Sequence, residues 1–217
     1  KLINQVVLID YTIIILGGEY MRKYEYMQEI LKENNGYLFT SQIEKEGISR
    51  TYLAKFVRDN NMEKVAKGIY ISEDTWVDDL YIIQICNPKI IFSGETALYL
   101  HGMIDREYSE ICVSVPSRFS QTRLREKGIV VHQERKGIYE LGVTNIDTNY
   151  GNSVRVYDKE RSICDLVKNR GNIEVQHFQT AMRIYMRDSS KDLSRLLMYA
   201  EKLNIRDEMM KYVEVMI

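Results

Sequence analysis

The order of local patterns in residues 21–72 constrains the fold more than any other feature of this chain: three short helical segments are followed by a tight hairpin. Apolar residues recur at helical spacing in residues 21–33 and 49–60. Two β-like runs then flank a turn at Gly68. Three helices and a two-stranded ribbon, in this order, are typical of a winged helix-turn-helix. We therefore predict this fold for residues 21–75.

Capping residues predict where the second and third helices begin and end. The second helix is expected to start at Thr40 or Ser41 as its N-cap and to end at Gly47. Ser49 is expected to be the N-cap of the third helix. The apolar stripe of this helix consists of Tyr52, Leu53, Phe56 and Val57.

The third helix of a winged helix-turn-helix enters the DNA major groove, and the wing lies along the backbone. Recognition helices read bases mainly from their N-terminal part, so Arg50, Thr51 and Tyr52 are expected near base edges. Gln42 and Ser49 are candidates for capping or phosphate contacts, and the cations of the helix and wing would neutralise phosphates. The predicted DNA-binding residues are Ser41, Gln42, Ser49, Arg50, Thr51, Tyr52, Lys55, Arg58, Lys64, Lys67 and Gly68. Protein–protein contact through a winged helix is the main competing interpretation.

The charge balance excludes a histone-like polycation and an acidic tail protein, because 30 Lys and Arg oppose 31 Asp and Glu. A local basic surface is still compatible with this total. Residues 21–72 contain nine basic and seven acidic residues, a difference of +2. The three cysteines are widely spaced and form no CxxC motif, which argues against a zinc site and fits a reducing cytoplasm. We expect a cytoplasmic protein with no metal and no cofactor.

The first twenty residues are expected to be a leader or a non-native extension. Residues 6–16 are apolar except for Asp10, and this run is too short to span a membrane. A signal peptide is an alternative, although no small-residue cleavage site is evident. Residues 16–19 (LGGE) can be encoded by a purine-rich message resembling a bacterial ribosome-binding site just before Met21. Our hypothesis is that Met21 is the natural start.

Residues 76–217 are predicted to form an α/β domain with a helical end, so that the whole chain is α+β. A small sheet flanked by helices is expected. Predicted helices cover residues 76–86, 96–101, 159–169, 173–187 and 192–217, with Ser93 and Asp158 as caps, and predicted strands cover 110–115, 128–131, 138–144 and 153–156.

Five segments carry a family resemblance: residues 36–43 (GYLFTSQI), 47–53 (GISRTYL), 64–70 (KVAKGIY), 92–102 (FSGETALYLHG) and 156–165 (VYDKERSICD). Together they resemble the AbiE-type antitoxins, the AbiEi family of bacterial abortive-infection toxin–antitoxin systems. The matching stretches span most of residues 36–165. The helices that follow match the family only in character.

The resemblance implies a function. In that family the N-terminal domain binds inverted repeats in double-stranded DNA of the operon's own promoter and represses it. The partner toxin is a nucleotidyltransferase, which a type IV antitoxin counteracts without a stable complex. We therefore expect an antitoxin and autorepressor with no membrane partner, and residues 76–217 would be the antitoxin domain.

An enzyme is the alternative. Residues 94–102, followed by Glu110 and Cys112, are similar to a nucleotidyltransferase core, where an Asp-x-Asp pair holds Mg²⁺. A thiol is a poor ligand for this hard ion, and the glycine pair of such cores is reduced here to Gly94. We therefore expect no catalytic activity, and a catalytically silent relative of that fold would suit an antitoxin. His101, His132 and His177 show no metal-ligand spacing.

A second basic surface is predicted within residues 118–136. Its cations are Arg118, Arg123, Arg125, Lys127, Arg135 and Lys136, and they oppose only Glu126 and Glu134, a difference of +4. One interpretation is a solvated loop. The sharper hypothesis is a surface that contacts DNA flanking the winged helix, or the RNA or protein surface relevant to the toxin.

Overall fold

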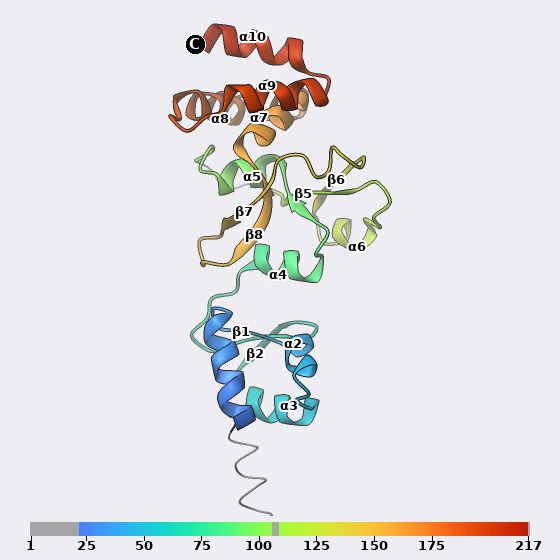
Figure 1. The fold of residues 1–217 in the computed structure, drawn as a ribbon, viewed down its shortest axis with the longest axis vertical. Coiled ribbons are helices and arrows are strands. Elements are labelled where there is room, and N and C mark those ends of the chain that lie inside the picture. Colours follow the sequence, from blue (N-terminus) through green and yellow to red (C-terminus); the bar gives the residue numbers. More distant parts are fainter. Residues whose placement is uncertain (1–21, 106–108, 217) are drawn as a thin grey trace, which may run out of the picture. The chain divides into compact units, whose positions relative to one another are not determined.

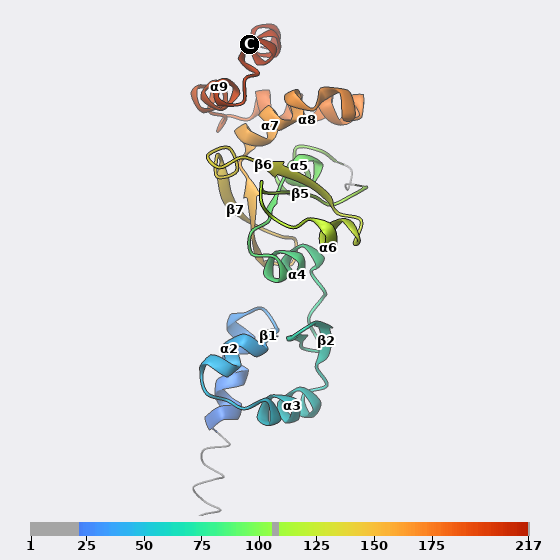
Figure 2. The same ribbon diagram turned by 90° about the vertical axis from the view of Figure 1, so that its right-hand side faces the viewer.

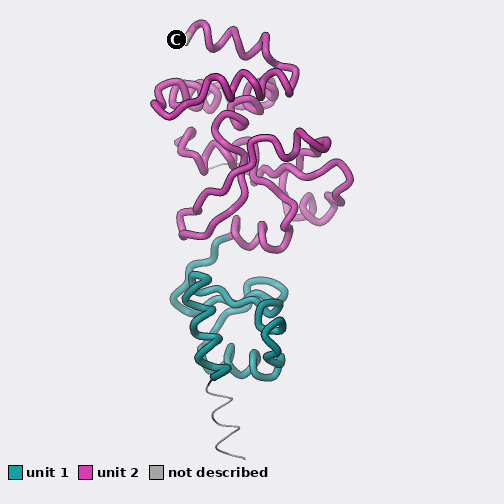
Figure 3. Tube along the Cα trace, viewed as in Figure 1, with its two compact units in different colours: residues 1–78 teal, residues 79–217 magenta. Residues whose placement is uncertain are grey.

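The computed structural model describes residues 22–105 and 109–216 and divides the chain into two compact units, residues 1–78 and 79–217 (Figure 3). Each unit contains one β-sheet together with helices, so the protein is a mixed α+β protein with two sheets. The prediction for residues 1–20 lies outside the described residues.

The N-terminal unit begins with a helix over residues 22–33 (Figures 1 and 2). Its further elements are β1 (Tyr37–Phe39), α2 (Thr40–Lys45), α3 (Arg50–Asp59), β2 (Glu63–Ala66) and β3 (Ile69–Ile71). The strands form an antiparallel sheet of order β1-β3-β2. The sequence predicted a two-stranded ribbon, and the third strand arises because residues 37–39 pair with residues 69–71.

One predicted helix start in this unit is wrong. Phe39 is the N-cap of α2, not Thr40 or Ser41, because β1 keeps the chain extended up to Phe39. The backbone N–H of Thr40 instead donates to the carbonyl of Gly68 at 2.9 Å. Ser49 does occupy the N-cap position of α3, but its side chain makes no capping hydrogen bond.

The predicted end of α2 at Gly47 is confirmed as a Schellman motif. Gly47 has a φ of +72°, its N–H donates to Glu44, and the N–H of Ile48 donates to Ile43. Ile43 and Ile48 are both buried in the core cluster of this unit, so the hydrophobic contact typical of the motif is present.

The core of the N-terminal unit joins all its helices to the sheet. Met27 and Ile30 of the first helix are buried with Leu53 and Phe56 of α3 and with Leu38 of β1. Each such side chain contributes about 1.5–3 kcal/mol when it leaves water. This core explains why α3 presents a fixed outer face.

A buried tyrosine holds the segment after β3 against the same unit. Tyr37 is fully buried, and its hydroxyl accepts from the N–H of Asp78 at 2.9 Å and donates to the carbonyl of Trp76 at 3.4 Å. Gly36 is required beside it, because a Cβ there would lie 1.8 Å from Oγ1 of Thr75 and the φ is +84°. The helix predicted over residues 76–86 therefore starts only at Asp79.

The C-terminal unit surrounds a five-stranded sheet of order β6-β5-β4-β8-β7. In this sheet β4–β8 and β5–β6 are parallel pairs, and the other neighbours are antiparallel. The strands are β4 (Ile91–Phe92), β5 (Cys112–Pro116), β6 (Val130–Glu134), β7 (Val143–Asp147) and β8 (Ser153–Tyr157). The helices are α4 (Asp79–Cys86), α5 (Gly94–Leu100), α6 (Thr122–Arg125), α7 (Lys159–Lys168), α8 (Val175–Arg187), α9 (Leu193–Lys202) and α10 (Arg206–Met216), with a 3₁₀ turn at Arg170–Asn172.

Helix α7 is the centre of this unit. It contacts α5, α8, α9 and α10, and every side chain in residues 160–167 is buried. Asp158 caps α7 as predicted, because its carboxylate accepts from the N–H of Arg161 at 2.8 Å. The two larger apolar clusters of this unit lie against the sheet around Phe92 and Val113, and among the helices around Tyr185 and Leu196.

Two predicted elements of the C-terminal unit are wrong. Residues 138–142 form turns rather than the start of a strand, because the carbonyls of Ile138 and Leu141 accept hydrogen bonds from Arg161 instead of from a neighbouring strand. The single helical stretch predicted over residues 192–217 is two helices. Asn204, with a φ of +57°, ends α9 in a Schellman motif like that at Gly47.

Within the residues that the structure describes, none of the helices is both long enough and apolar enough to cross a membrane.

Candidate nucleic-acid interface

The outer face of α3 is polar and cationic. Successive residues of a helix are rotated by about 100°, so Thr51, Lys55 and Arg58 share one side. All three are exposed, whereas Leu53 and Phe56 on the opposite side are 4% and 1% exposed. The helix therefore presents hydrogen-bonding and positively charged side chains to an external ligand while its apolar stripe is occupied by the core.

The hairpin β2–β3 adds two further cations in the same unit. Lys64 and Lys67 are exposed, and Lys67 precedes Gly68 in the turn. Gly68 has a φ of +76°, which a residue with a Cβ adopts only with strain. The ladder is irregular between Lys64 and Ala66, as expected for a bulge beside a short turn.

Arg50, the residue predicted to read a base, is held by its own chain. Its guanidinium makes a hydrogen-bonded ion pair with Glu44 of α2, and this bond raises the pKa of Arg50. The two side chains are 80% and 40% exposed. An ion pair this exposed to water contributes little to stability, so Arg50 can leave Glu44 for a stronger acceptor.

Some of the remaining predicted residues have exposed side chains, and the others have side chains that contact other residues of the same unit. Ser41 and Ser49 are exposed. Gln42 accepts a hydrogen bond from the side chain of Asn34 at 2.8 Å. Tyr52 is partly buried against the core, and the ammonium of Lys23 lies 4.9 Å from its ring centre. Tyr52 therefore supports α3 more than it extends toward a ligand.

The second basic surface is exposed at all six predicted cations. Strands β5 and β6 are parallel, with Pro116 opposite Glu134, so Arg118 and Arg135 follow their strands at the same edge of the sheet. Glu134 turns inward and lies 3.4 Å from the buried guanidinium of Arg161. Within residues 118–136, Glu126 is therefore the acidic residue that is exposed beside the six exposed cations.

The residues of the enzyme alternative line a cavity of about 510 Å³ in the C-terminal unit. Gly94, Glu110 and Cys112 meet there, beside the hydrogen-bonded pair of His177 and Glu95, whose Nδ1 and Oε1 are 2.9 Å apart. Burial raises the pKa of Cys112 to about 11, so its thiol is protonated near neutral pH. Across residues 22–105 and 109–216, no three His, Cys, Asp or Glu side chains converge in a way that could hold a metal ion.

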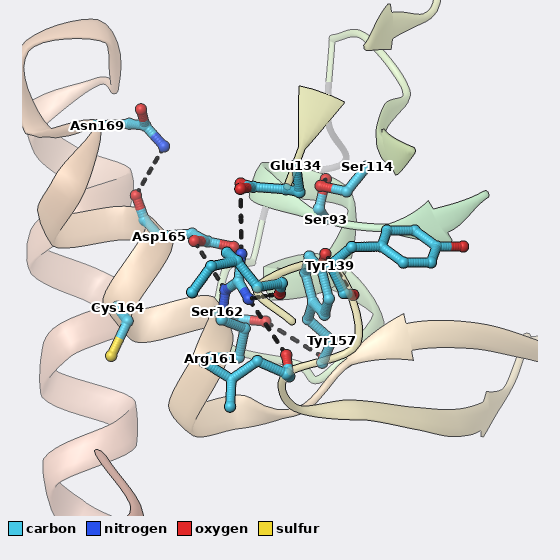
Figure 4. Close-up of polar contacts among 12 residues, drawn as sticks. Ser93, Ser114, Glu134, Tyr139, Tyr157, Arg161, Ser162, Cys164, Asp165 and Asn169 are labelled. Carbon is cyan, nitrogen blue, oxygen red and sulfur yellow. Dashed lines mark hydrogen bonds and ion pairs between the residues drawn. The ribbon is translucent and has the colours of Figure 1, made fainter. Parts of the chain in front are cut away.

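A buried arginine pairs with Asp165, one of the residues that line this cavity. The side chain of Arg161 is fully buried between Asp165 and Glu134 (Figure 4). Its Nε donates to Asp165 at 3.0 Å, its Nη1 donates to the carbonyls of Ile138 and Leu141 at 2.6 and 3.2 Å, and its guanidinium lies 4.2 Å from the Tyr157 ring centre. Burial raises the pKa of Asp165, and the charge of Arg161 opposes this rise.

Sequence reasoning did not single out this network. A signal for it exists in the sequence, because Arg161 and Asp165 are spaced i and i+4 within one predicted helix. That spacing predicts an ion pair on one face of the helix, but it does not predict that the two side chains are buried.

The fold resembles one already seen in a crystal. The protein titled RV2827C, from Mycobacterium tuberculosis, superimposes with a TM-score of 0.54 at 10% sequence identity, over 81% of this chain and 70% of that chain. At this identity the similarity concerns the fold alone. No protein-family model matches the chain, and neither does any curated protein.

Proposed function

We propose that residues 22–78 form a winged helix-turn-helix that binds double-stranded DNA through α3 and the β2–β3 hairpin. The observation that carries this proposal is the outer face of α3. Its exposed side chains Thr51, Lys55 and Arg58 lie opposite Leu53 and Phe56, which are buried in the core. The element order and the sheet order β1-β3-β2 support it, since the hairpin of such a fold is its wing.

Two kinds of contact follow from this arrangement. Arg50 and Thr51, at the start of α3, would contact base edges, where a bidentate arginine discriminates by about 1–3 kcal/mol. Lys55, Arg58 and Lys67 would contact phosphates and release counterions, each contact making the salt dependence of binding steeper by about 0.9 in slope. The exposed cations of residues 118–136 would add a second, sequence-independent contact.

We further propose that the chain is the antitoxin and autorepressor of an abortive-infection operon. This step rests on the resemblance of residues 36–165 to the AbiE-type antitoxins. The bound DNA would then be the inverted repeats of the operon's own promoter. The functional partner would be a nucleotidyltransferase toxin, counteracted without a stable complex.

The experiment is binding of the full chain to its promoter fragment, measured by fluorescence anisotropy over a range of salt concentrations. Arg50→Ala is expected to weaken promoter binding by about 1–3 kcal/mol and to relax sequence preference. Lys67→Ala is expected to weaken binding to all DNA alike and to reduce the salt slope. Lys32→Ala, an exposed cation on the first helix, is the matched control and should change neither.

Glu44→Gln tests the role of the ion pair directly. Removal of the carboxylate frees Arg50 and removes a negative charge near the phosphates, so affinity should rise. Equal, small effects of Arg50→Ala, Lys67→Ala and Lys32→Ala would refute α3 and the hairpin as the DNA-binding elements. Salt-independent or undetectable DNA binding would favour a protein-only module.

A further inference from the structure

A second surface that the DNA-binding proposal does not use is a groove between α8 and α10, with a volume of about 700 Å³. Phe178 and Met182 of α8 and Tyr212 and Val215 of α10 form its apolar lining. The rings of Phe178 and Tyr212 are in contact, with centres 5.1 Å apart, so the two helices are packed together at its base. The groove is therefore already formed in the free chain.

One apolar wall of the groove is exposed to water. Val215 is 85% exposed, although it lies on the last turns of a helix whose Met209 and Val213 are buried. Exposed apolar surface costs about 25 cal/mol per Å² relative to its burial. An occupant that covers Val215 would gain this free energy.

The rim of the groove carries one sign of charge. Arg170, Arg183 and Lys211 line it, and no acidic residue does. The guanidinium of Arg170 is positioned over the Phe178 ring, 4.3 Å from its centre. Arg183 and Lys211 are both exposed, and among the described residues neither forms an ion pair with a carboxylate.

We propose that this groove binds an acidic amphipathic helix of a partner protein. Such a helix places apolar side chains at i, i+3 or i+4 and i+7 into a groove, and its flanking carboxylates would face the three cations. A nucleic acid would satisfy the cations but leave the exposed side chain of Val215 in contact with water. This proposal does not depend on DNA binding through α3, so an experiment can refute either one without refuting the other.

The test uses peptides selected on the full chain. A phage-displayed library of amphipathic helical segments of about 16 residues, near 24 Å long, is randomised at its polar positions and panned against the protein. The expected result is enrichment of Asp and Glu beside the apolar positions. An enriched peptide is then synthesised with a fluorophore, and its affinity for purified variants is measured by anisotropy.

The variants separate the groove from general electrostatics. Arg183→Glu/Lys211→Glu should weaken peptide binding at least tenfold, and Val215→Asp should do the same through the apolar wall. The control Arg187→Glu/Lys202→Glu makes the same charge change at exposed cations of α8 and α9 outside the groove and should retain affinity within about twofold. All altered side chains except Val215 are surface cations, and Val215 is exposed, so far-UV circular dichroism should match that of the wild type.

Several outcomes would overturn the proposal. One is that no acidic peptide is enriched, and another is that both double variants lose affinity equally. Displacement of the peptide by a single-stranded oligonucleotide whose own binding needs Arg183 and Lys211 would assign the groove to nucleic acid. Self-association of the chain that Val215→Asp abolishes would assign it to a second copy.

Discussion

Replacement of Arg161 by Met is expected to destabilise the C-terminal unit severely. Methionine fills a similar length without charge, so the change tests the polar contacts rather than the volume. It removes the partner of Asp165, which is 7% exposed, and the donors to the carbonyls of Ile138 and Leu141. Glu134 is less affected, because water reaches it.

The magnitude follows from these contacts. Removal of one partner from a buried ion pair costs about 3–5 kcal/mol, and each buried carbonyl left without a donor adds up to about 1–3 kcal/mol. These costs overlap, so we expect a loss of about 5 kcal/mol against a typical domain stability of about 5–15 kcal/mol. Without Arg161 the pKa of Asp165 rises further, so the loss should be smaller at low pH, where this carboxyl is protonated in the folded state.

Urea unfolding followed by far-UV circular dichroism measures this loss, since α7 and its neighbouring helices lie in the affected unit. Arg161→Met/Asp165→Asn should recover about 1–3 kcal/mol of it, because no charge is then left buried. Arg123→Met, at an exposed arginine, is the control and should remain within about 0.5 kcal/mol of the wild type. A loss below about 1 kcal/mol for Arg161→Met, or no recovery in the double variant, would refute the reasoning.

Three further predictions concern other parts of the chain. Gly36→Ala should lower the thermal midpoint of the N-terminal unit more than Gly47→Ala, because only the first Cβ meets a neighbour, at 1.8 Å; equal shifts would contradict this. Asp188→Asn should destabilise the protein at neutral pH, because Lys159 and Ser190 hold the pKa of Asp188 well below its usual value. That stabilisation is present above the unfolded pKa of about 3.9 and is lost as the pH falls through the folded pKa, so urea midpoints of the variant and the wild type should converge in acid. Arg123→Glu/Arg125→Glu/Lys127→Glu should weaken promoter binding or toxin neutralisation, measured by anisotropy and by growth rescue, and no change in either would retire the second basic surface.

The elements predicted well from sequence are those with local causes. Helix α3 was expected over residues 49–60 and is found at Arg50–Asp59, because its apolar stripe repeats at 3.6-residue spacing. Gly68 marked the hairpin turn through its left-handed backbone, and Asp158 marked the start of α7. A residue's own conformational preference is enough to specify each of these features.

The elements missed from sequence have distant causes. Strand β4 is only two residues long, too short for an alternating pattern, yet it lies at the centre of the five-stranded sheet. Helix α6, with four residues, is also below the length that periodicity detects. The turns of residues 138–142 replaced a predicted strand because their carbonyls bind a guanidinium some 20 residues further along the chain.

The candidate site shows the same division. The sequence by itself determined which cations α3, the hairpin and residues 118–136 carry, because residue type and helical spacing are local information. Only the tertiary structure decided which of these side chains can reach an external ligand. Arg50 forms an ion pair with Glu44, and Tyr52 packs against the core. Glu134 points away from the basic surface and forms an ion pair with Arg161. The groove between α8 and α10 likewise exists only after packing, because Phe178 must contact Tyr212 before Arg183 and Lys211 share one rim. Contacts between residues far apart in the chain depend on where the core brings them together, and no local pattern encodes that position.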